Sequence, residues 1–529
     1  MPTDCISYQN SGYFSPLMND YLDQTKNLHD LYNRFPLLEN FEEQISEKQA
    51  NFDNTNRLTL AKVLHKQYSK LETSQLTQQN IESLKVNNTF TVTTGHQLNL
   101  FSGPLYFLYK IISTINLTAE LKARYPAYNF VPIYWMATED HDFEEINYFN
   151  FKGKKFRWNT ESTGPVGRLS TDGLDQFLEI YSKELGASTN ASYLKSLFEK
   201  SYIEHKNLAD ATRYLANTLF GAYGLVILDA DDTQLKRTFI PFIKEDLEKQ
   251  TAYKNVIETG KKLADYKIQV NPREINLFYI EGDLRERIIF EDNKYFINNT
   301  KIQFSKEELF NLVDQHPEKF SPNVIMRPLY QEVILPNLCY IGGGGEIAYW
   351  LELKSFFDAV KITFPILLVR NSVLLATEKQ SKKAEKLELS WSDLFLKQQD
   401  LENKITHRIS GFPIDLTAQK DALQKQFADL FAIAAQTDLS FTGAVKAQEA
   451  KQTKGLANLE KRLLKAQKRK LGDQIERVTE LQNELFPNQS LQERQANFSE
   501  FYLEKGTELI PNIFQKLQPL KNEFSIITI

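Results

Sequence analysis

Residues 94–147 read TGHQLNLFSGPLYFLYKIISTINLTAELKARYPAYNFVPIYWMATEDHDFEEIN, and this stretch decides the fold. A short β-branched strand at 90–94 leads into a turn with glycine, an apolar helix runs to about residue 124, and a second strand follows at 130–138. This order builds one βαβ unit, in which ligands bind beyond the carboxyl ends of the strands. We therefore expect the loops at 95–104 and 139–145 to face the same crevice.

Buried strands recur with helices between them, and this alternation predicts a doubly wound, Rossmann-like parallel α/β core. Further strands are expected at 224–229, 339–341 and 364–370, with a helix at 346–354. The segment 324–328 reads as another core strand, which places Arg327 at a strand end. The predicted organisation is an N-terminal helical segment at 1–88 packing on the core, and a core at 89–372 with insertions near 149–223 and 240–320.

Apolar residues spaced by seven mark the remainder of the chain as helical. They are Leu387, Leu394 and Leu401, followed by Leu464, Leu471, Val478 and Leu485. Such heptads predict an antiparallel coiled-coil arm at 373–485, folded back at the turn 411–413, with a tail at 486–529 that returns to the core. Two helices bury only one seam, so we expect the arm to form a homodimer.

The composition argues against several classes of function. The net charge of -5 speaks against broad electrostatic binding to nucleic acid. The two cysteines, Cys5 and Cys339, make a disulfide scaffold implausible, and the chain start has no basic region followed by an apolar one. No apolar run approaches the roughly 20 residues that span a bilayer. We expect a cytoplasmic protein that binds neither nucleic acid nor membrane.

The segment 139–145, EDHDFEE, carries five carboxylates and one imidazole. Mutual repulsion raises carboxylate pKa values unless a cation is close, and the cation could be a substrate ammonium, a metal or an arginine. His141 could act as a general base or as a ligand. The alternative is a solvated loop that caps the next helix, although capping needs only one acid.

Two glycine-containing turns could approach a ligand. In 95–104, Ser102 offers a helix N-cap and the backbone N–H groups suit an anion, or the segment is only a tight turn. The run 342–345 lies before a helix and is either a ligand contact or a flexible turn. Arg327 could clamp a carboxylate or phosphate, or pair with the acids. No CxxC or HExxH motif supports a zinc site, and no metal site is predicted.

Five long motifs together resemble the cysteine-adding BshC family of bacillithiol biosynthesis. They are TGHQLNLFSGPLYFLYK, VPIYWMATEDHDFEEIN, GLVILDADD, SPNVIMRPLYQEVILPNLCYIGGGGEIAYWLELK and LFPNQSLQERQANF, and the resemblance covers essentially the whole chain. It implies a core like that of class I aminoacyl-tRNA synthetases and nucleotidylyltransferases, connecting-peptide insertions and a dimerising coiled coil. The HxGH signature of class I adenylating enzymes is not present, since 101–104 keeps only the glycine.

The resemblance also implies a ligase that joins cysteine to the amino group of glucosaminyl-malate. Because carboxylates are poor acyl donors, we expect ATP, with Mg²⁺, to activate the cysteine carboxylate. The alternatives are an ATP-independent transferase with a preactivated cysteine donor, and a non-catalytic nucleotide-binding scaffold. The residues expected to be catalytic are Asp140, His141 and Asp142. The substrate-binding set is His96, Gln97, Glu145, Arg327, Gln331 and Glu346. The nucleotide-binding set is Gly95, Ser102, Gly103, Gly342, Gly343 and Gly344.

Overall fold

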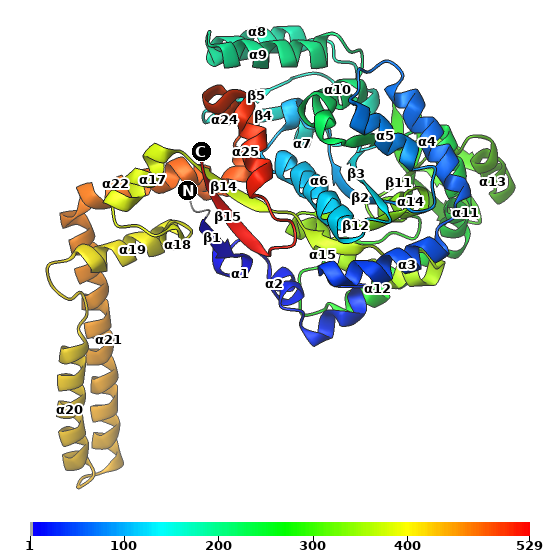
Figure 1. The fold of residues 1–529 in the computed structure, drawn as a ribbon. Coiled ribbons are helices and arrows are strands. Elements are labelled where there is room, and N and C mark those ends of the chain that lie inside the picture. Colours follow the sequence, from blue (N-terminus) through cyan, green and yellow to red (C-terminus); the bar gives the residue numbers. More distant parts are fainter. Residues whose placement is uncertain (1–3) are drawn as a thin grey trace. The chain divides into compact units, whose positions relative to one another are not determined.

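A computed structural model describes residues 4–529. The chain forms two compact units, one made of Met1–Leu375 and Leu491–Ile529 and the other of Ala376–Ser490. The first unit is built on a parallel sheet, and the second consists of helices (Figure 1). None of the helices within 4–529 is both long and apolar enough to cross a membrane.

The central sheet has five parallel strands in the order β13-β12-β2-β3-β6. They are β2 (Thr89–His96), β3 (Asn129–Met136), β6 (Val226–Asp229), β12 (Asn337–Gly342) and β13 (Ile366–Val369). The chain enters at β2 in the centre, extends to one edge through β3 and β6, and then continues on the other side of β2 with β12 and β13. This doubly wound order confirms the predicted fold class and puts the topological switch point between β2 and β12.

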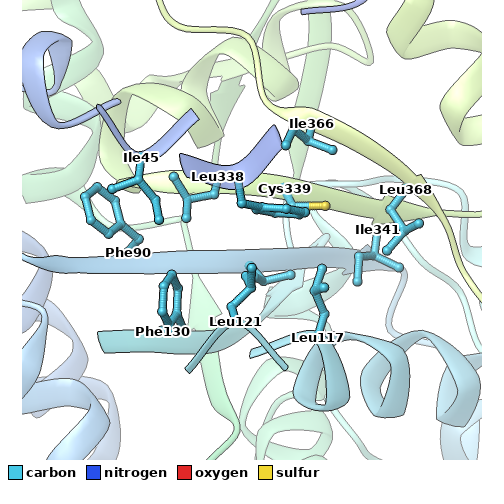
Figure 2. Packing of buried hydrophobic residues seen from close by; sticks show 12 residues of the cluster. Ile45, Phe90, Leu117, Leu121, Phe130, Leu338, Cys339, Ile341, Ile366 and Leu368 are labelled. Carbon is cyan, nitrogen blue, oxygen red and sulfur yellow. The ribbon is translucent and has the colours of Figure 1, made fainter. Parts of the chain in front are cut away.

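An apolar cluster packs against the central sheet. Alternate residues of the strands pack with helices α3 (Phe41–Asn51) and α6 (Tyr106–Arg124), as Figure 2 shows. The cluster comprises Phe41, Ile45, Phe90, Val92, Leu117, Leu121, Phe130, Leu338, Cys339, Ile341, Ile366 and Leu368. Neighbouring residues of a strand point to opposite faces. Tyr340 accordingly points away from Cys339 and Ile341, and its ring packs 4.6 Å from that of Trp350 in α15 (Gly344–Leu351).

Two insertions interrupt the sheet. The first holds the hairpin β4 (Tyr148–Phe151) and β5 (Lys154–Arg157) and the helices α8 (Leu174–Leu185), α9 (Thr189–Phe198) and α10 (Leu208–Phe220). The second begins with α11 (Thr233–Lys249) and α12 (Thr251–Lys262). It continues into an antiparallel sheet of order β10-β9-β8-β7-β11, made of β7 (Leu277–Glu281), β8 (Leu284–Glu291), β9 (Lys294–Ile297), β10 (Gln303–Phe304) and β11 (Phe320–Pro322).

The two ends of the chain meet in a third sheet of order β1-β15-β14. Its strands are β1 (Asp4–Ser7), β15 (Glu523–Thr528) and β14 (Ser372–Ala376), and β1 pairs antiparallel with β15. Between β1 and β2 lie α2 (Pro16–Leu22), α3, α4 (Thr55–Tyr68) and α5 (Gln75–Ser83). This segment is fastened to the core by buried polar contacts, such as the Tyr21 hydroxyl donating to the Leu367 carbonyl at 2.6 Å.

Two local predictions in the core are wrong. Arg327 does not end a strand but lies in the first turn of α14 (Met326–Ile334), since the Asn323 side chain accepts hydrogen bonds from the backbone N–H groups of Ile325 and Met326. A short apolar run does not distinguish a strand from a buried helix. The helix after β2 begins at Tyr106 rather than at Ser102, and its N-cap is Leu105.

The second unit contains α17 (Glu378–Lys386), α18 (Trp391–Leu394), α19 (Gln398–Ile409), α20 (Thr417–Ala434), α21 (Leu439–Lys470) and α22 (Gly472–Leu485). Helices α20 and α21 form an antiparallel hairpin (Figure 1) around Phe427, Ala434 and Val445. The predicted reversal at 411–413 is wrong. α21 packs against both α19 and α20, so the chain reverses at 435–438, where Asp438 caps α21.

A buried carboxyl in the second insertion leads to a prediction about pH. Asp246 in α11 is 2 % exposed, its Oδ2 accepts the Asn276 N–H at 2.7 Å, and its Oδ1 has no partner among residues 4–529. Burial raises its pKa from 3.8 to about 7. A raised carboxyl pKa means that stability is greatest below the unfolded pKa and falls as pH rises toward 7. Asp246→Asn should therefore stabilise the protein by about 1–3 kcal/mol at pH 8.

Thermal unfolding between pH 4.5 and pH 9 checks this expectation. The gain in Asp246→Asn should shrink as pH falls, because the wild-type carboxyl then becomes neutral. Glu248→Gln on the same helix is the control, since Glu248 is solvent-exposed and its ion pair with Lys306 contributes little. A gain of equal size at both ends of the pH range would contradict the assignment to Asp246.

Candidate active site

A cavity of about 1100 Å³ opens where the strands of the central sheet end. Its wall includes His96 at the end of β2, Glu139 after β3, Ala230 after β6, Gly343 after β12 and Arg370 after β13. The second insertion covers another side with residues of β8 and of the segment before β7. This is the position at which doubly wound sheets bind their ligands, so we name it the strand-end cavity.

The acid cluster after β3 does not act as one group. Glu139 turns inward and pairs with the buried ammonium of Lys236, while Glu144 pairs with Arg157. Asp142 caps the short helix α7 (Phe143–Ile146) by accepting the Glu145 N–H at 3.3 Å. Of the residues predicted here, Asp140 and His141 line the cavity, and Glu139 joins them. Asp142 and Glu145 do not.

Asp140 is the carboxylate best prepared for chemistry. Its Oδ2 accepts from Gln97 Nε2 at 2.9 Å, and its Oδ1 accepts from the His141 backbone N–H at 2.7 Å. Burial opposes ionisation, but these hydrogen bonds and the nearby Arg285 charge hold the pKa of Asp140 well below its usual range. The same Gln97 amide donates to Glu145 Oε2 at 2.8 Å. Gln97 therefore fixes an ionised Asp140 at the cavity wall.

His141 is oriented by a residue that the sequence did not single out. Arg285 in β8 donates to His141 Nδ1 at 2.8 Å, and its guanidinium lies over the Phe278 ring at 3.9 Å. An imidazole nitrogen that accepts from a guanidinium cannot carry a proton, so the proton of neutral His141 is on Nε2. In this arrangement His141 offers the cavity a hydrogen-bond donor.

A second polar cluster joins the ends of β2 and β12. The Lys110 ammonium, on α6, pairs with Glu346 Oε1 at 2.6 Å and donates to the Gly95 carbonyl at 2.6 Å. Glu346 also accepts from the Tyr340 hydroxyl at 2.7 Å and from the Gly343 N–H at 3.1 Å. Burial lowers the pKa of Lys110, and Glu346 opposes that shift. The cluster braces the two strands that flank the switch point.

The Arg327 guanidinium is held by neutral side chains. Its guanidinium donates to Gln331 Oε1 at 3.1 Å and to the Tyr349 hydroxyl at 3.2 Å, and lies 5.8 and 5.7 Å from the Trp135 and Tyr340 rings. The ion pairs of residues 4–529 include none between Arg327 and a carboxylate. Gln331 positions Arg327 without lining the cavity itself.

The cavity wall is predominantly basic, although the chain as a whole is acidic. Its cations are Lys110, Arg273, Arg285, Arg287, Arg327, Arg370 and Arg494, and its carboxylates are Glu139, Asp140, Glu286 and Glu346. Of these cations, only Arg327 was predicted from sequence. The rule about strand ends could also have found Arg370, which follows β13 directly. Within residues 4–529 no group of three His, Cys, Asp or Glu side chains is arranged to hold a metal ion.

The turn predicted to cradle phosphate lies elsewhere. Phe101, Ser102 and Gly103 all have positive φ, and the turn is buried against the C-terminal tail. Asn497 Nδ2 donates to the carbonyls of Phe101 and Gly103 at 2.9 and 2.6 Å. A side chain on Gly103 would come 2.6 Å from Asn99 Cβ, so this glycine is required by packing. Among the predicted nucleotide-binding residues, Gly95 and Gly343 line the cavity, and Ser102, Gly103, Gly342 and Gly344 do not.

Comparison with known proteins places the whole chain in one group. Residues 1–371 match the family described as bacillithiol biosynthesis BshC, N-terminal Rossmann-like domain, and residues 373–529 match its C-terminal coiled-coil domain. Two proteins named as cysteine ligase BshC are similar over essentially their full length. One from Flavobacterium johnsoniae is 73% identical, covering 100% of both chains, and one from Flavobacterium psychrophilum is 64% identical, covering 100% of this chain and 99% of that one.

More distant proteins also match. A protein of the same name from Staphylococcus carnosus is 29% identical over 94% of this chain and 96% of its own. A solved structure named as an arginyl-tRNA synthetase from Campylobacter jejuni covers 88% of this chain and 98% of that one, with 12% identity and a TM-score of 0.21. A score of that size does not establish a shared fold.

Proposed function

This chain belongs to the BshC family of bacillithiol biosynthesis proteins, and from that premise we propose that it is a cysteine ligase. The reaction joins the cysteine carboxylate to the amino group of glucosaminyl-malate. The observation that carries the proposal is the basic strand-end cavity with an ionised Asp140 at its wall. Glucosaminyl-malate brings two carboxylates and ATP brings phosphates, so both suit a wall with excess positive charge.

Amide formation from a carboxylate requires activation, because a carboxylate is a poor acyl donor. In the proposed route the cysteine carboxylate attacks the α-phosphate of ATP and pyrophosphate leaves. The substrate amine then attacks the carbonyl carbon, AMP leaves, and the amine nitrogen loses one proton to solvent water. Asp140 accepts a hydrogen bond from the attacking amine and orients it, and His141 Nε2–H donates to the departing group.

Anions in the cavity would be held by side chains rather than by a glycine-rich turn. Arg327 has no carboxylate partner among the described residues, and Arg285 and Arg494 also reach the wall. Planar guanidinium groups bind carboxylate and phosphate with paired hydrogen bonds. The expected phosphate contact at Ser102 and Gly103 is therefore replaced in this proposal by arginines.

Turnover by the purified protein tests the proposal. With cysteine, glucosaminyl-malate, ATP and Mg²⁺, we expect bacillithiol by mass spectrometry together with AMP and pyrophosphate. Cells that lack the protein should accumulate glucosaminyl-malate and contain no bacillithiol. Product formed without ATP from a preactivated cysteine donor would support a transferase instead. A protein that binds nucleotide but forms no product from any donor would support the scaffold alternative.

We also propose that the second unit makes the protein a homodimer. Near the tip of the α20–α21 hairpin, Leu439 is 91% exposed and Phe441 is 44% exposed. Apolar side chains exposed on a hairpin that buries only one seam favour association with a second copy.

The dimer is tested by size measurement. Replacing Leu439 and Phe441 with Asp should give a monomer in light scattering while the unfolding temperature changes little, because neither side chain is buried. The control replaces Gln448 and Gln452, exposed on the same helix, with Asp, which adds the same charge. A monomeric wild-type protein at micromolar concentration would refute the dimer.

A further inference from the structure

Two buried polar atoms at one end of the strand-end cavity lack partners among residues 4–529. They are His96 Nε2 and Arg370 Nε, and their residues are 7% and 4% exposed. Both residues line the cavity, at the ends of β2 and β13. A buried polar atom without a partner costs free energy, so such atoms at a cavity wall indicate a ligand. We name His96, Tyr106, Gly343 and Arg370 the switch-point end of the cavity.

His96 has one defined hydrogen-bonding state. Its Nδ1 lies 2.7 Å from the Gln97 carbonyl oxygen, which can only accept, so Nδ1 carries the proton and Nε2 presents a lone pair. Burial and the neighbouring Lys110 charge lower the pKa of His96 to about 3. The ring is held between Tyr106 and Phe107, whose centroids lie 5.3 and 5.0 Å away. His96 is thus a rigid, neutral acceptor.

Arg370 offers the complementary donor. Its two terminal nitrogens donate to Glu493 at 3.0 and 2.7 Å, one of them also donates to the Asn371 carbonyl at 2.9 Å, and Nε has no partner among residues 4–529. A Cβ placed on Gly343 would lie 3.9 Å from Nε, so the donor lies beside the N-cap residue of α15, whose own N–H is bound by Glu346. The Tyr106 ring lies 5.0 Å from the Arg370 guanidinium carbon and also contacts His96. The acceptor residue His96 and the donor residue Arg370 therefore contact the same aromatic ring.

We propose that the switch-point end binds an anionic group with a neighbouring hydroxyl, Arg370 Nε–H donating to the anion and His96 Nε2 accepting from the hydroxyl. A hydroxyl fits better than an ammonium, because Lys110 and Arg370 are cations close to His96. This inference deepens the proposed function and rests on it. Two of the proposed substrates carry the required chemistry: glucosaminyl-malate through a carboxylate and a sugar hydroxyl, and the nucleotide through its phosphate and ribose.

Calorimetric titration of His96 variants with glucosaminyl-malate and with AMP, each without turnover, tests the inference and identifies the source. His96→Phe keeps a ring and removes the acceptor, so it should weaken one of the two ligands about tenfold or more. In His96→Gln the amide oxygen can still accept the hydrogen bond, so the affinity for that ligand should stay within about threefold of wild type. If the His96→Phe substitution lowers the unfolding temperature, His96→Leu is used in its place as the variant that lacks the acceptor.

Deoxy analogues of the ligands test whether His96 binds a ligand hydroxyl directly, because a purely structural role of His96 would not depend on that hydroxyl. A 2′- or 3′-deoxy-AMP, or a deoxyglucosaminyl-malate, should lose affinity for the wild type but lose no more for His96→Phe, because the two changes remove the same hydrogen bond. Equal affinity of wild type and folded His96→Phe for both ligands would overturn the inference. Equal losses of affinity in His96→Phe and His96→Gln would also overturn it. A wild type that binds neither ligand and forms no product would instead overturn the proposed function as well.

Discussion

Asp140→Asn is expected to lower kcat/KM for bacillithiol formation by about a hundredfold or more while leaving the unfolding temperature nearly unchanged. The wild-type carboxylate is ionised, oriented by Gln97 and exposed to the cavity. Asparagine keeps an oxygen that can accept the His141 N–H but cannot stabilise the charge that develops on the attacking amine. Steady-state kinetics with each substrate varied in turn measures the loss.

The control for this experiment lies two residues away. Asp142→Asn changes the same charge in the same segment, but Asp142 caps α7 outside the cavity, and asparagine caps helices equally well. Its activity should stay within about threefold of wild type. Equal losses in the two variants would show that the segment contributes charge alone, and full activity in Asp140→Asn would show that Asp140 has no role in the reaction.

The difference between these two aspartates marks what sequence could and could not predict. The βαβ order of residues 94–147 follows from local apolar periodicity, and the rule that ligands lie at strand ends directed attention to 139–145, of which 139–141 line the cavity. Which carboxylate faces the cavity depends on where α7 begins, and that start is set by a single capping bond of Asp142. Charge density along the chain does not contain this information.

Other features of the site that the sequence did not predict also have physical causes. Lys110 lies within an apolar helix, and nothing in the sequence around it indicates a functional role. Its role follows from tertiary contacts, because its ammonium binds Glu346 and the Gly95 carbonyl. Arg285 comes from the second insertion, whose placement over the cavity depends on tertiary packing. The turn at Ser102 looked like a helix start because Pro104 suits the first turn, yet Phe101 and Ser102 adopt positive φ, which side-chain-bearing residues rarely do.

A buried ion pair between the N-terminal segment and the core gives the largest expected change in stability. Lys48 in α3 donates to Glu332 Oε2 in α14 at 2.8 Å, and the two side chains are 2% and 0% exposed. Removing one partner of such a pair leaves the other charge buried, which costs about 3–5 kcal/mol. Lys48→Met should therefore lower the free energy of unfolding by that amount in urea titration at pH 8. Lys66→Met, which removes an exposed partner of Asp232, is the control and should change it little.

The pH dependence of Lys48→Met identifies the cause. Burial already raises the pKa of Glu332, Lys48 opposes the shift, and losing Lys48 raises that pKa further. A raised carboxyl pKa favours folding at low pH, so the variant should lose less stability at pH 5 than at pH 8. Adding Glu332→Gln removes the buried carboxylate charge. It keeps an oxygen that can accept from the Asn337 amide, which in the wild type donates to Glu332 at 2.7 Å. The double variant should recover most of the loss at pH 8. If Lys48→Met loses the same stability at both pH values and Glu332→Gln restores none of it, then Lys48 contributes through packing of its aliphatic chain and not through its charge.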